Sequence, residues 1–121
     1  MNTQEYLEWF HKNCHFHMKW MGRQAMKTPW DAWVYQEIIY EMKPDVIIEI
    51  GNMEGGSTLF LANLLDCLGK GRVLGVDIDH SKVKDLQHNR IMWITGDAKE
   101  PAVLSKVKEF IQPEDRVMVI E

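Results

Sequence analysis

Carboxylates and glycines gather around one predicted strand-to-helix junction. Glu49 lies in the apolar run Val46–Ile50. Three glycines, Gly51, Gly55 and Gly56, follow before a helical pattern begins. Such a junction points backbone N–H groups and a helix N-terminus at the carboxyl edge of a parallel sheet, and glycines let a ligand approach the backbone without meeting a Cβ. The segment predicts a small-molecule binding loop; the alternative is a tight turn that binds nothing.

A second carboxylate, Asp77, closes the apolar run Val73–Asp77. At the end of a neighbouring strand, a carboxylate can accept hydrogen bonds from ribose hydroxyls. Asp77 and Glu49 together suit a nucleoside that also carries positive charge, and S-adenosylmethionine is the leading candidate. The alternative for Asp77 is a solvated loop acid. Asp79, two residues on, could instead cap a helix that starts at Ser81.

Gly96 and Asp97 follow a third apolar run, Ile91–Ile94. The Asp97 carboxylate could accept a hydrogen bond from an adenine amino group, or it could cap the helix that comes next. Both interpretations stay open.

Several better-known motifs are missing. A dinucleotide fingerprint needs glycine where Met53 stands, and no Gly-Lys-Ser/Thr follows as a Walker loop requires. No Ser/His/Asp order or Cys/His pair indicates a covalent nucleophile. Four residues near the start invite a metal hypothesis, but their spacing matches no closed zinc site, and we expect them to be solvated or packed. These are His11, Cys14, His15 and His17.

Apolar, β-branched runs alternate with helical patterns, which indicates βαβ units and a parallel sheet with strands buried on both faces. The predicted strands are Val46–Ile50, Val73–Asp77, Ile91–Ile94 and Val117–Ile120. The predicted helices between them are Ser57–Cys67, Ser81–Gln87 and Pro101–Ile111.

The amino-terminal part is predicted as a helix over Thr3–Asn13, capped by Thr3, and an irregular arm over 15–27. Thr28 is expected to cap a second helix, with Pro29 in its first turn, and Pro44 forces that helix to stop. We divide the chain into an N-terminal helix and arm, residues 1–27, and a Rossmann-like cofactor-binding domain, residues 28–121.

Composition narrows the function classes. The chain has 121 residues and a net charge of -4, which gives no support for nucleic acid as the main partner. No apolar run is long enough to span a membrane, and no signal segment opens the sequence. Two cysteines, Cys14 and Cys67, fit a reducing compartment. We therefore expect a cytoplasmic protein with neither a nucleic-acid nor a membrane partner; the small-molecule substrate is expected from the binding loop and from the resemblance given below.

The last predicted strand, Val117–Ile120, is apolar and would lie at a sheet edge, where it is open to association. Either another chain covers it or this chain is the front half of a longer protein. We predict a homo-oligomer that forms through this edge strand or through the N-terminal arm.

An ordered set of segments resembles the cephalosporin hydroxylase and rhamnosyl O-methyltransferase family from Trp20 onward. The segments are Trp20–Gly22, Lys27–Ile39, Lys43–Asp45, Glu49–Gly51, Gly55–Ser57, Gly75–Asp79, His88–Arg90 and Arg116–Ile120. The resemblance implies an α/β, Rossmann-like parallel sheet of about four strands in the order 3-2-1-4, flanked by helices, as a truncated class I methyltransferase fold. It also implies S-adenosylmethionine as cofactor.

The resemblance assigns roles to matching positions. The first cofactor loop would surround the methionine part, Asp77 would hold the ribose, and Gly96 and Asp97 would lie near the adenine. The arm from Trp20 to Asp31 would lie near the cofactor or substrate mouth, with Lys27 and Asp31 as its polar candidates. The expected cofactor-binding residues are Glu49, Gly51, Asn52, Gly55, Gly56, Ser57, Asp77, Ile78, Gly96 and Asp97.

The resemblance also limits the catalytic prediction. In the family, residues beyond the fourth strand bind a divalent metal such as Mg²⁺, and this sequence ends at that strand. No metal ligand is therefore predicted here, except Glu121 as a weak candidate. The expected activity is O-methyl transfer to a hydroxyl of a small molecule or sugar. The alternative is a non-catalytic module for S-adenosylmethionine binding or assembly. An oxygenase is disfavoured because no two-His-one-carboxylate set is visible.

Overall fold

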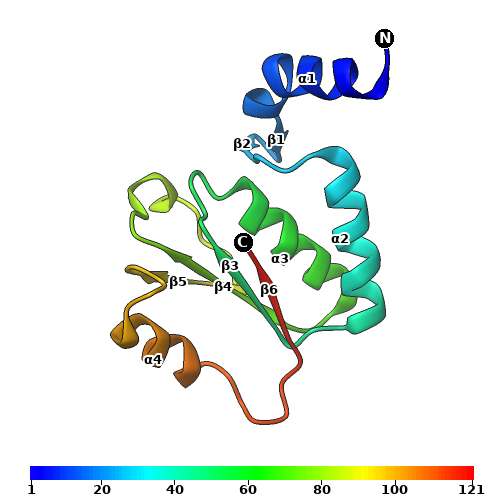
Figure 1. Ribbon diagram of the computed structural model, residues 1–121. Helices are drawn as coiled ribbons and strands as arrows, with labels where there is room; N and C mark the ends of the chain where they lie inside the picture. Colours follow the sequence, from blue (N-terminus) through cyan, green and yellow to red (C-terminus); the bar gives the residue numbers. More distant parts are fainter.

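A four-stranded parallel sheet forms the centre of the computed structural model, which describes residues 1–121. The strand order β5-β4-β3-β6 confirms the predicted order 3-2-1-4 (Figure 1). The strands are β3 (Val46–Ile50), β4 (Arg72–Asp77), β5 (Ile91–Thr95) and β6 (Val117–Ile120).

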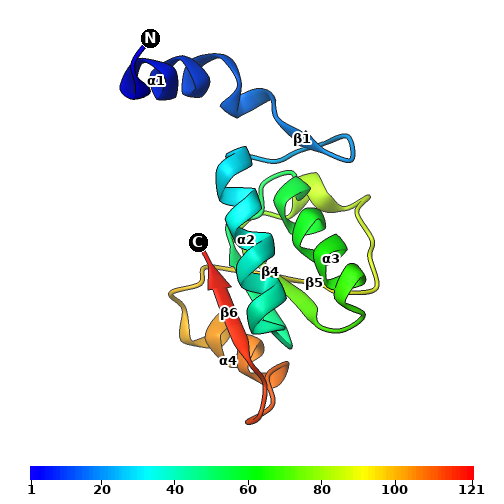
Figure 2. The same ribbon diagram turned by 90° about the vertical axis from the view of Figure 1, so that its right-hand side faces the viewer.

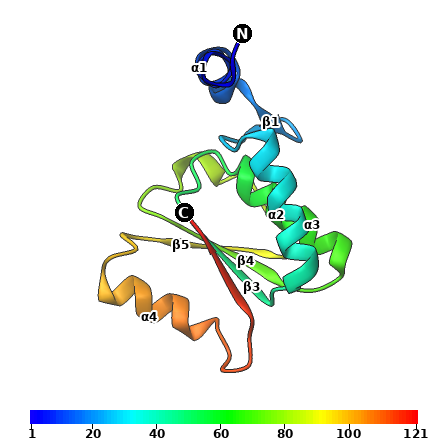
Figure 3. The ribbon, with the colours of Figure 1, turned by 45° about the vertical axis from the view of Figure 1, so that its right-hand side comes forward.

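Helices lie on both faces of this sheet (Figure 3). Helices α2 (Pro29–Met42) and α3 (Gly56–Leu68) cover one face, and α4 (Pro101–Glu109) covers the other. Successive β3 side chains serve opposite faces, as the strand period requires: Ile47 joins the core with α2 and α3, whereas Val46 and Ile48 join the core with α4.

Burial on both faces, predicted for all four strands, holds only for the inner two. Residues 46–49 of β3 and 73–76 of β4 are buried. The outer strands expose Met92 and Val119, at 39% and 60%. The prediction was wrong for β5 and β6 because an outer strand has a neighbour on one side only and the helices cover it incompletely.

The predicted start of α2 is confirmed. Thr28 Oγ1 accepts a hydrogen bond from Asp31 N at 3.2 Å, and Pro29 occupies the first turn. Helix α1 covers Thr3–Asn13 as predicted, but its cap is Asn2 and not Thr3. Asn2 Oδ1 accepts a hydrogen bond from Glu5 N, and Glu5 Oε2 accepts one from Asn2 N. This reciprocal pair is a capping box, which a cap at Thr3 would not provide.

The arm is more ordered than predicted. A 3₁₀ turn, η1 (His15–His17), leads to a short antiparallel hairpin of β1 (Lys19–Trp20) and β2 (Arg23–Gln24). Met21 and Gly22 both have positive φ, the conformation of a two-residue hairpin turn that matches strand twist. Figure 2 shows α1 standing off from the body, with this hairpin between them.

The helix predicted over Ser81–Gln87 is wrong. Only a 3₁₀ turn, η2 (Ser81–Val83), forms there. The Lys82 carbonyl accepts a hydrogen bond from the Arg23 guanidinium at 3.0 Å instead of from a later backbone N–H. Helix α4 also ends at Glu109, earlier than the predicted Ile111.

None of the helices combines the length and apolar character needed to cross a bilayer. Cys14 and Cys67 are both free thiols.

Candidate functional site

The β3–α3 turn opens onto solvent at one glycine. Gly51 has φ +85°, and a Cβ built on it would meet no heavy atom within 4 Å. The other two glycines of the turn face protein instead: a Cβ on Gly55 would lie 2.7 Å from Leu86, and one on Gly56 would lie 2.2 Å from the Gln24 carbonyl oxygen. Close approach of a ligand to the backbone is therefore possible at Gly51, whereas Gly55 and Gly56 are needed for packing.

Glu49 lies beneath this turn and has no exposed surface. Its Oε1 accepts from Asn52 Nδ2 at 2.9 Å and from the Thr58 hydroxyl, and its Oε2 accepts from the Ser57 hydroxyl. The carboxyl group thereby links the end of β3 to the first turn of α3. Glu49 shapes the loop from below and presents no oxygen to a ligand.

Asp77 faces the same turn from the end of β4. Its Oδ2 accepts from Asn52 N at 2.7 Å and from Met53 N at 3.2 Å, and its Oδ1 accepts from Asp79 N at 3.2 Å. Burial raises the pKa of Asp77, but these backbone donors and the nearby His80 outweigh burial, so the pKa lies below its ordinary value. A carboxylate has about four acceptor positions, so about one remains for a ligand hydroxyl.

A cavity of about 370 Å³ lies at the carboxyl ends of the strands. Its walls include residues predicted to bind the cofactor, which come from three different loops, and the last residue of the chain. The lining residues are Ile50, Gly51, Val76, Asp77, Ile78, Gly96, Asp97, Ala98, Lys99 and Glu121. The sheet thus brings together Gly51, Asp77 and Asp97, which are far apart in sequence.

Asp97 does not cap α4, and its side chain lines the cavity at the strand ends. Its Oδ1 accepts from Lys99 N at 2.9 Å, which holds the turn before α4. The N-cap of α4 is Glu100, so Asp97 does not cap the helix itself. Its exposed side chain lines the cavity, whereas Gly96 is required by packing, because a Cβ there would lie 2.4 Å from Val103.

A smaller cavity of about 170 Å³ lies on the other side of the turn. The turn contributes Gly51, Asn52, Met53 and Ser57, and the arm contributes Gln24, Met26 and Lys27. Gly51 belongs to the walls of both cavities, which therefore meet at this residue. Of the two polar candidates at the mouth, Lys27 lines this cavity, while Asp31 lies at the start of α2 and lines neither.

The arm is fastened to the turn by backbone and side-chain contacts. Arg23 Nε donates to the Glu54 carbonyl at 2.9 Å, and the guanidinium pairs with Asp85 at 2.8 Å. Because Gly56 has no Cβ, the backbone of β2 can cross close to the N-terminus of α3. The arm is thus one wall of the candidate site, the region where the family resemblance placed it.

Gly56→Ala is expected to displace the arm. Alanine favours a helix over glycine by roughly 0.5–1 kcal/mol, but its Cβ would collide with the Gln24 and Arg23 carbonyl oxygens, so we expect a net loss of about 1–3 kcal/mol in unfolding free energy. Limited trypsin digestion should then cut at Arg23 faster than in the parent chain. Gly69→Ala, at the other end of α3, is the control for general destabilisation: at φ +77° alanine costs about 1–2 kcal/mol, but its Cβ meets nothing within 4 Å, so cleavage at Arg23 should rise clearly less than in Gly56→Ala. Equal cleavage rates in Gly56→Ala and the parent would contradict the contact.

Sequence reasoning missed His80, which supports the turn through Asn52 without lining either cavity. Its Nε2 lies 2.8 Å from Asn52 Oδ1, and its Nδ1 lies 2.8 Å from Thr95 Oγ1. Because the Asn52 amide already donates to Glu49, its oxygen faces the imidazole and accepts from Nε2–H. The only signal in the sequence is the position of His80 shortly after a strand end.

His80 should make stability depend on pH. Burial lowers the pKa of His80, while Asp77 and Asp79 act in the opposite direction. The unfolded chain then binds more protons below an ordinary histidine pKa of about 6.5, so the free energy of unfolding falls as pH drops through that value. Urea unfolding at about pH 7.5 and 5.5 should show a smaller fall for His80→Gln than for the parent. The exposed His17→Gln is the control; an equal fall in both variants would contradict this role.

No group of three or more His, Cys, Asp or Glu side chains lies in an arrangement that could hold a metal ion. In the His/Cys segment, His11 stacks on His15 and packs against Phe16, and Cys14 is a free thiol. The His88–Arg90 segment lies at the opposite end of the sheet, where His88 and Arg90 both bind Asp66. Neither segment reaches the cavities at the turn.

A parallel sheet whose glycine turn faces a carboxylate on the next strand is the architecture of Rossmann-like proteins that bind nucleoside cofactors. The sequence profile of the rhamnosyl O-methyltransferase/CmcI family matches residues 12–121, and the chain belongs to that family.

Known relatives agree with this assignment. Rhamnosyl O-methyltransferase of Mycobacterium leprae is 36% identical over 112 residues, which cover 88% of this chain and 48% of that protein. The Mycobacterium tuberculosis enzyme of the same name is 31% identical over 111 residues, covering 88% of this chain and 45% of that protein. The chain thus spans about half the length of these curated relatives.

Solved structures confirm the predicted methyltransferase fold. An apo structure of CmcI superimposes with a TM-score of 0.76 at 25% identity, covering 88% of this chain and 46% of that one. A CmcI structure with Mg and S-adenosylmethionine gives a TM-score of 0.69 at 24% identity, covering 86% and 44%. A third CmcI structure, with S-adenosylhomocysteine, gives 0.71 at 21% identity, covering 98% and 61%.

Proposed function

We propose that this chain is the cofactor-binding part of an S-adenosylmethionine-dependent O-methyltransferase that acts on a hydroxyl of a small molecule or sugar. The observation that carries the proposal is the cavity where Gly51, Asp77 and Asp97 meet at the carboxyl ends of three strands. The names of the relatives support methyl transfer to a sugar, and the CmcI structures named for S-adenosylmethionine and S-adenosylhomocysteine support the cofactor.

In this proposal the adenosyl group occupies the cavity at the strand ends. The free acceptor position on Asp77 takes one ribose hydroxyl, and Asp97 takes the adenine amino group. The methionine part follows the turn past Gly51 toward Asn52 and Ser57. Gly51 permits that path because no atom lies where its Cβ would be.

The cofactor supplies an electrophilic methyl group; the protein must align the acceptor oxygen and allow its proton to leave. The walls of this chain can bind and orient the cofactor. Asp77, Asp97 and Glu121 bring three carboxylates to the cavity, but they are not arranged so that they could hold a metal ion. These residues do not complete a magnesium site, and we assign no step of methyl transfer to a metal here.

Titration calorimetry of the 121-residue protein with S-adenosylhomocysteine tests the cofactor proposal. We expect one site per chain, with NAD⁺ binding at least tenfold more weakly, because the turn lacks the dinucleotide fingerprint. Absence of S-adenosylhomocysteine binding, or equal binding of NAD⁺, would overturn the proposal.

A non-catalytic binding or assembly module is the second candidate. It is favoured by one observation: no group of side chains that could hold a metal ion stands beside the cavity. Transfer of a labelled methyl group from S-adenosylmethionine to rhamnosides, other sugars and phenols separates the two candidates. Turnover by the purified 121-residue protein would exclude the module.

We also propose that this protein self-associates, acts in the cytoplasm and binds neither nucleic acid nor membrane. Strand β6 lies at the sheet edge with Val119 at 60% exposure, and α1 and α2 expose Trp9 and Trp33 at 48% and 66%. Such apolar surfaces favour association. Sedimentation should show dimers or larger species at about 100 µM, and Val119→Lys should shift them toward monomer if β6 is the contact. A monomer at every concentration would contradict self-association.

A further inference from the structure

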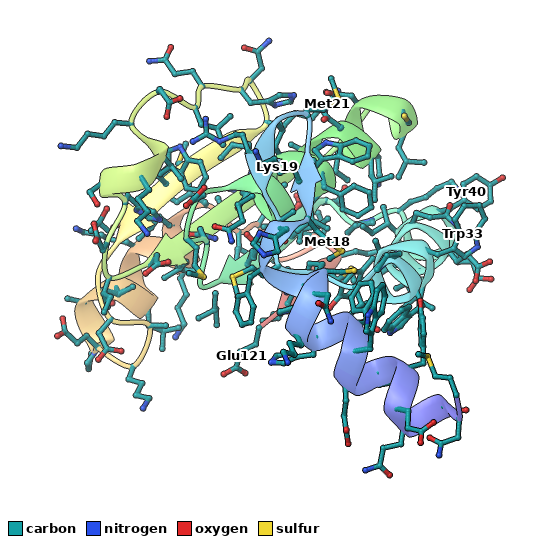
Figure 4. All side chains as sticks on the ribbon, turned by 90° about the horizontal axis from the view of Figure 1, so that it is seen from above. Met18, Lys19, Met21, Trp33, Tyr40 and Glu121 are labelled. Carbon is teal, nitrogen blue, oxygen red and sulfur yellow. The ribbon has the colours of Figure 1, made fainter.

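The row of side chains that crosses the sheet next to the β3–α3 turn is interrupted by a glycine. Glu49, Gly75 and Trp93 are paired neighbours on β3, β4 and β5. A Cβ on Gly75 would lie 2.6 Å from the Trp93 ring and 3.0 Å from Asn52 Oδ1. Gly75 therefore makes room for the Asn52 side chain, and Asn52 is only 4% exposed. Figure 4 looks onto this end of the sheet, where Glu121 follows β6.

The imidazole of His80 packs against the Trp93 ring and links two loops. The two ring centres lie 5.0 Å apart. Nε2–H donates to Asn52 Oδ1 at 2.8 Å, and Nδ1, which carries no proton in this tautomer, accepts from the Thr95 hydroxyl at 2.8 Å. Hydrogen bonds thus run from the end of β5 through His80 to the turn after β3.

Asn52 is the residue on which these contacts converge. Its side-chain amide donates to the Glu49 carboxylate at 2.9 Å, and its backbone N–H donates to Asp77 at 2.7 Å. His80 donates to the amide oxygen and so fixes which way the amide faces. With the amide turned round, its oxygen would face the Glu49 carboxylate, and two acceptors would oppose each other. His80 therefore holds the orientation on which the turn and its bond to Asp77 depend.

We propose that His80 is a positioning residue for the cofactor, because it holds the Asn52 amide and thereby the arrangement in which Asp77 keeps one acceptor position free for a ribose hydroxyl. The inference rests on the proposed methyltransferase function and adds regulation of the same site by pH. His80 lines neither cavity at the turn, so it acts on the cofactor through Asn52 and Asp77 and not by contact.

Protonation of His80 should weaken cofactor binding. Burial lowers the pKa of His80, while the charges of Asp77 and Asp79 act in the opposite direction. Glu49 lies behind the Asn52 amide. The neighbours from the other elements carry no charge and are Asn52, Thr95 and Trp93. An imidazolium draws on the Asp77 carboxylate, and a ribose hydroxyl bound there competes with it. The cofactor-bound chain then holds fewer protons than the free chain, so affinity falls as pH drops below about 6.5, an ordinary histidine pKa.

Calorimetry with S-adenosylhomocysteine on the 121-residue protein at about pH 7.5 and 5.5 tests the effect of pH. Asp77 stays ionised at both values, because its pKa lies below its ordinary value. The parent should bind more weakly at the lower pH, by up to about tenfold, whereas His80→Gln should bind equally at both. The exposed His11→Gln, outside both cavities, is the control and should lose as much as the parent. An equal loss in the parent and His80→Gln would overturn the inference.

Two substitutions of His80 separate positioning from packing. Both remove the imidazole from Trp93, but glutamine can place an N–H donor where Nε2 lies, and asparagine is too short to reach Asn52. At about pH 7.5, His80→Asn should therefore bind S-adenosylhomocysteine roughly fivefold or more weakly than His80→Gln. Urea unfolding shows whether both variants are folded, and the pH comparison decides alone if His80→Asn is not.

The outcomes distinguish this inference from the proposed function. Equal affinities of folded His80→Gln and His80→Asn, with the parent binding S-adenosylhomocysteine, would overturn the positioning role and leave the cofactor proposal standing. Absence of binding to the parent at about pH 7.5 would overturn both.

Discussion

Glu49→Ala should lower the free energy of unfolding by about 3–5 kcal/mol, the largest stability effect we expect at this site. The substitution removes the one group that binds Asn52, Ser57 and Thr58 together. Glu49 has no exposed surface, so the amide of Asn52 and the two hydroxyls would lose their acceptor inside the protein. Urea unfolding followed by circular dichroism measures the loss.

Two comparisons make the Glu49 result specific. Glu49→Gln keeps the shape and one acceptor oxygen, and the two hydroxyls can rotate, so its cost should be clearly smaller than that of alanine. Glu54 lies in the same turn without a side-chain hydrogen bond or ion pair, and Glu54→Ala should change stability by no more than about 0.5 kcal/mol. Similar losses for Glu49→Ala and Glu54→Ala would contradict the proposed role of Glu49 in holding the turn.

Asp77→Ala should weaken S-adenosylhomocysteine binding roughly 10- to 150-fold, or about 1.5–3 kcal/mol, the usual strength of a hydrogen bond to a charged group. Two effects contribute: the ribose hydroxyl loses its acceptor, and the Asn52 and Met53 N–H groups lose the carboxylate that holds the turn. Calorimetry on the parent and the variant gives the ratio.

Asp79→Ala is the matched control for Asp77. Asp79 is exposed, binds Ser81 N at 2.8 Å and does not line the cavity, so affinity should change less than about twofold. The direct hydroxyl contact is separated from the turn effect by comparing adenosine with 2′,3′-dideoxyadenosine. Loss of the hydroxyls should weaken binding to the parent but not to Asp77→Ala. An equal penalty in both proteins would remove Asp77 from the ribose site.

The strands of the sheet were predictable from local patterns, whereas their order followed from the family resemblance. Apolar, β-branched runs such as Val46–Ile50 favour strands, and the helical patterns between them favour parallel pairing. Capping residues likewise act within a few positions, which is why Thr28 and Pro29 marked the start of α2 correctly.

The candidate site was predictable only in part. Asp77 and Gly51 follow strand ends, so a parallel sheet necessarily brings them to one edge. The partners of Glu49 could not be read in this way, because whether a carboxylate faces a ligand or the underside of a turn depends on χ angles and packing. The sequence therefore indicated the location of Glu49 but not that its oxygens are already bound.

Contacts between segments that are distant in sequence could not be predicted, because they leave no local pattern in the sequence. The crossing of β2 over Gly56 places the backbone of Arg23 and Gln24 against a glycine far away in sequence, and the link from His80 to Asn52 spans two loops. The helix predicted at Ser81–Gln87 failed for the same reason, since Arg23, far away in sequence, binds the Lys82 carbonyl. Propensity is a weak prior where tertiary contacts compete with the helix.

Amide-resolved NMR of the 121-residue protein titrated with S-adenosylhomocysteine tests the central claim most directly. The molecule offers a polar depression at the opposite end of the sheet as an internal comparison, lined by Asp66, Gly71, Arg72 and residues 87–90. We predict that the largest shifts fall on Gly51, Asn52, Asp77, Ile78, Gly96 and Asp97, with none in residues 87–90. Shifts centred on residues 87–90, or spread without a focus at the strand ends, would contradict the account.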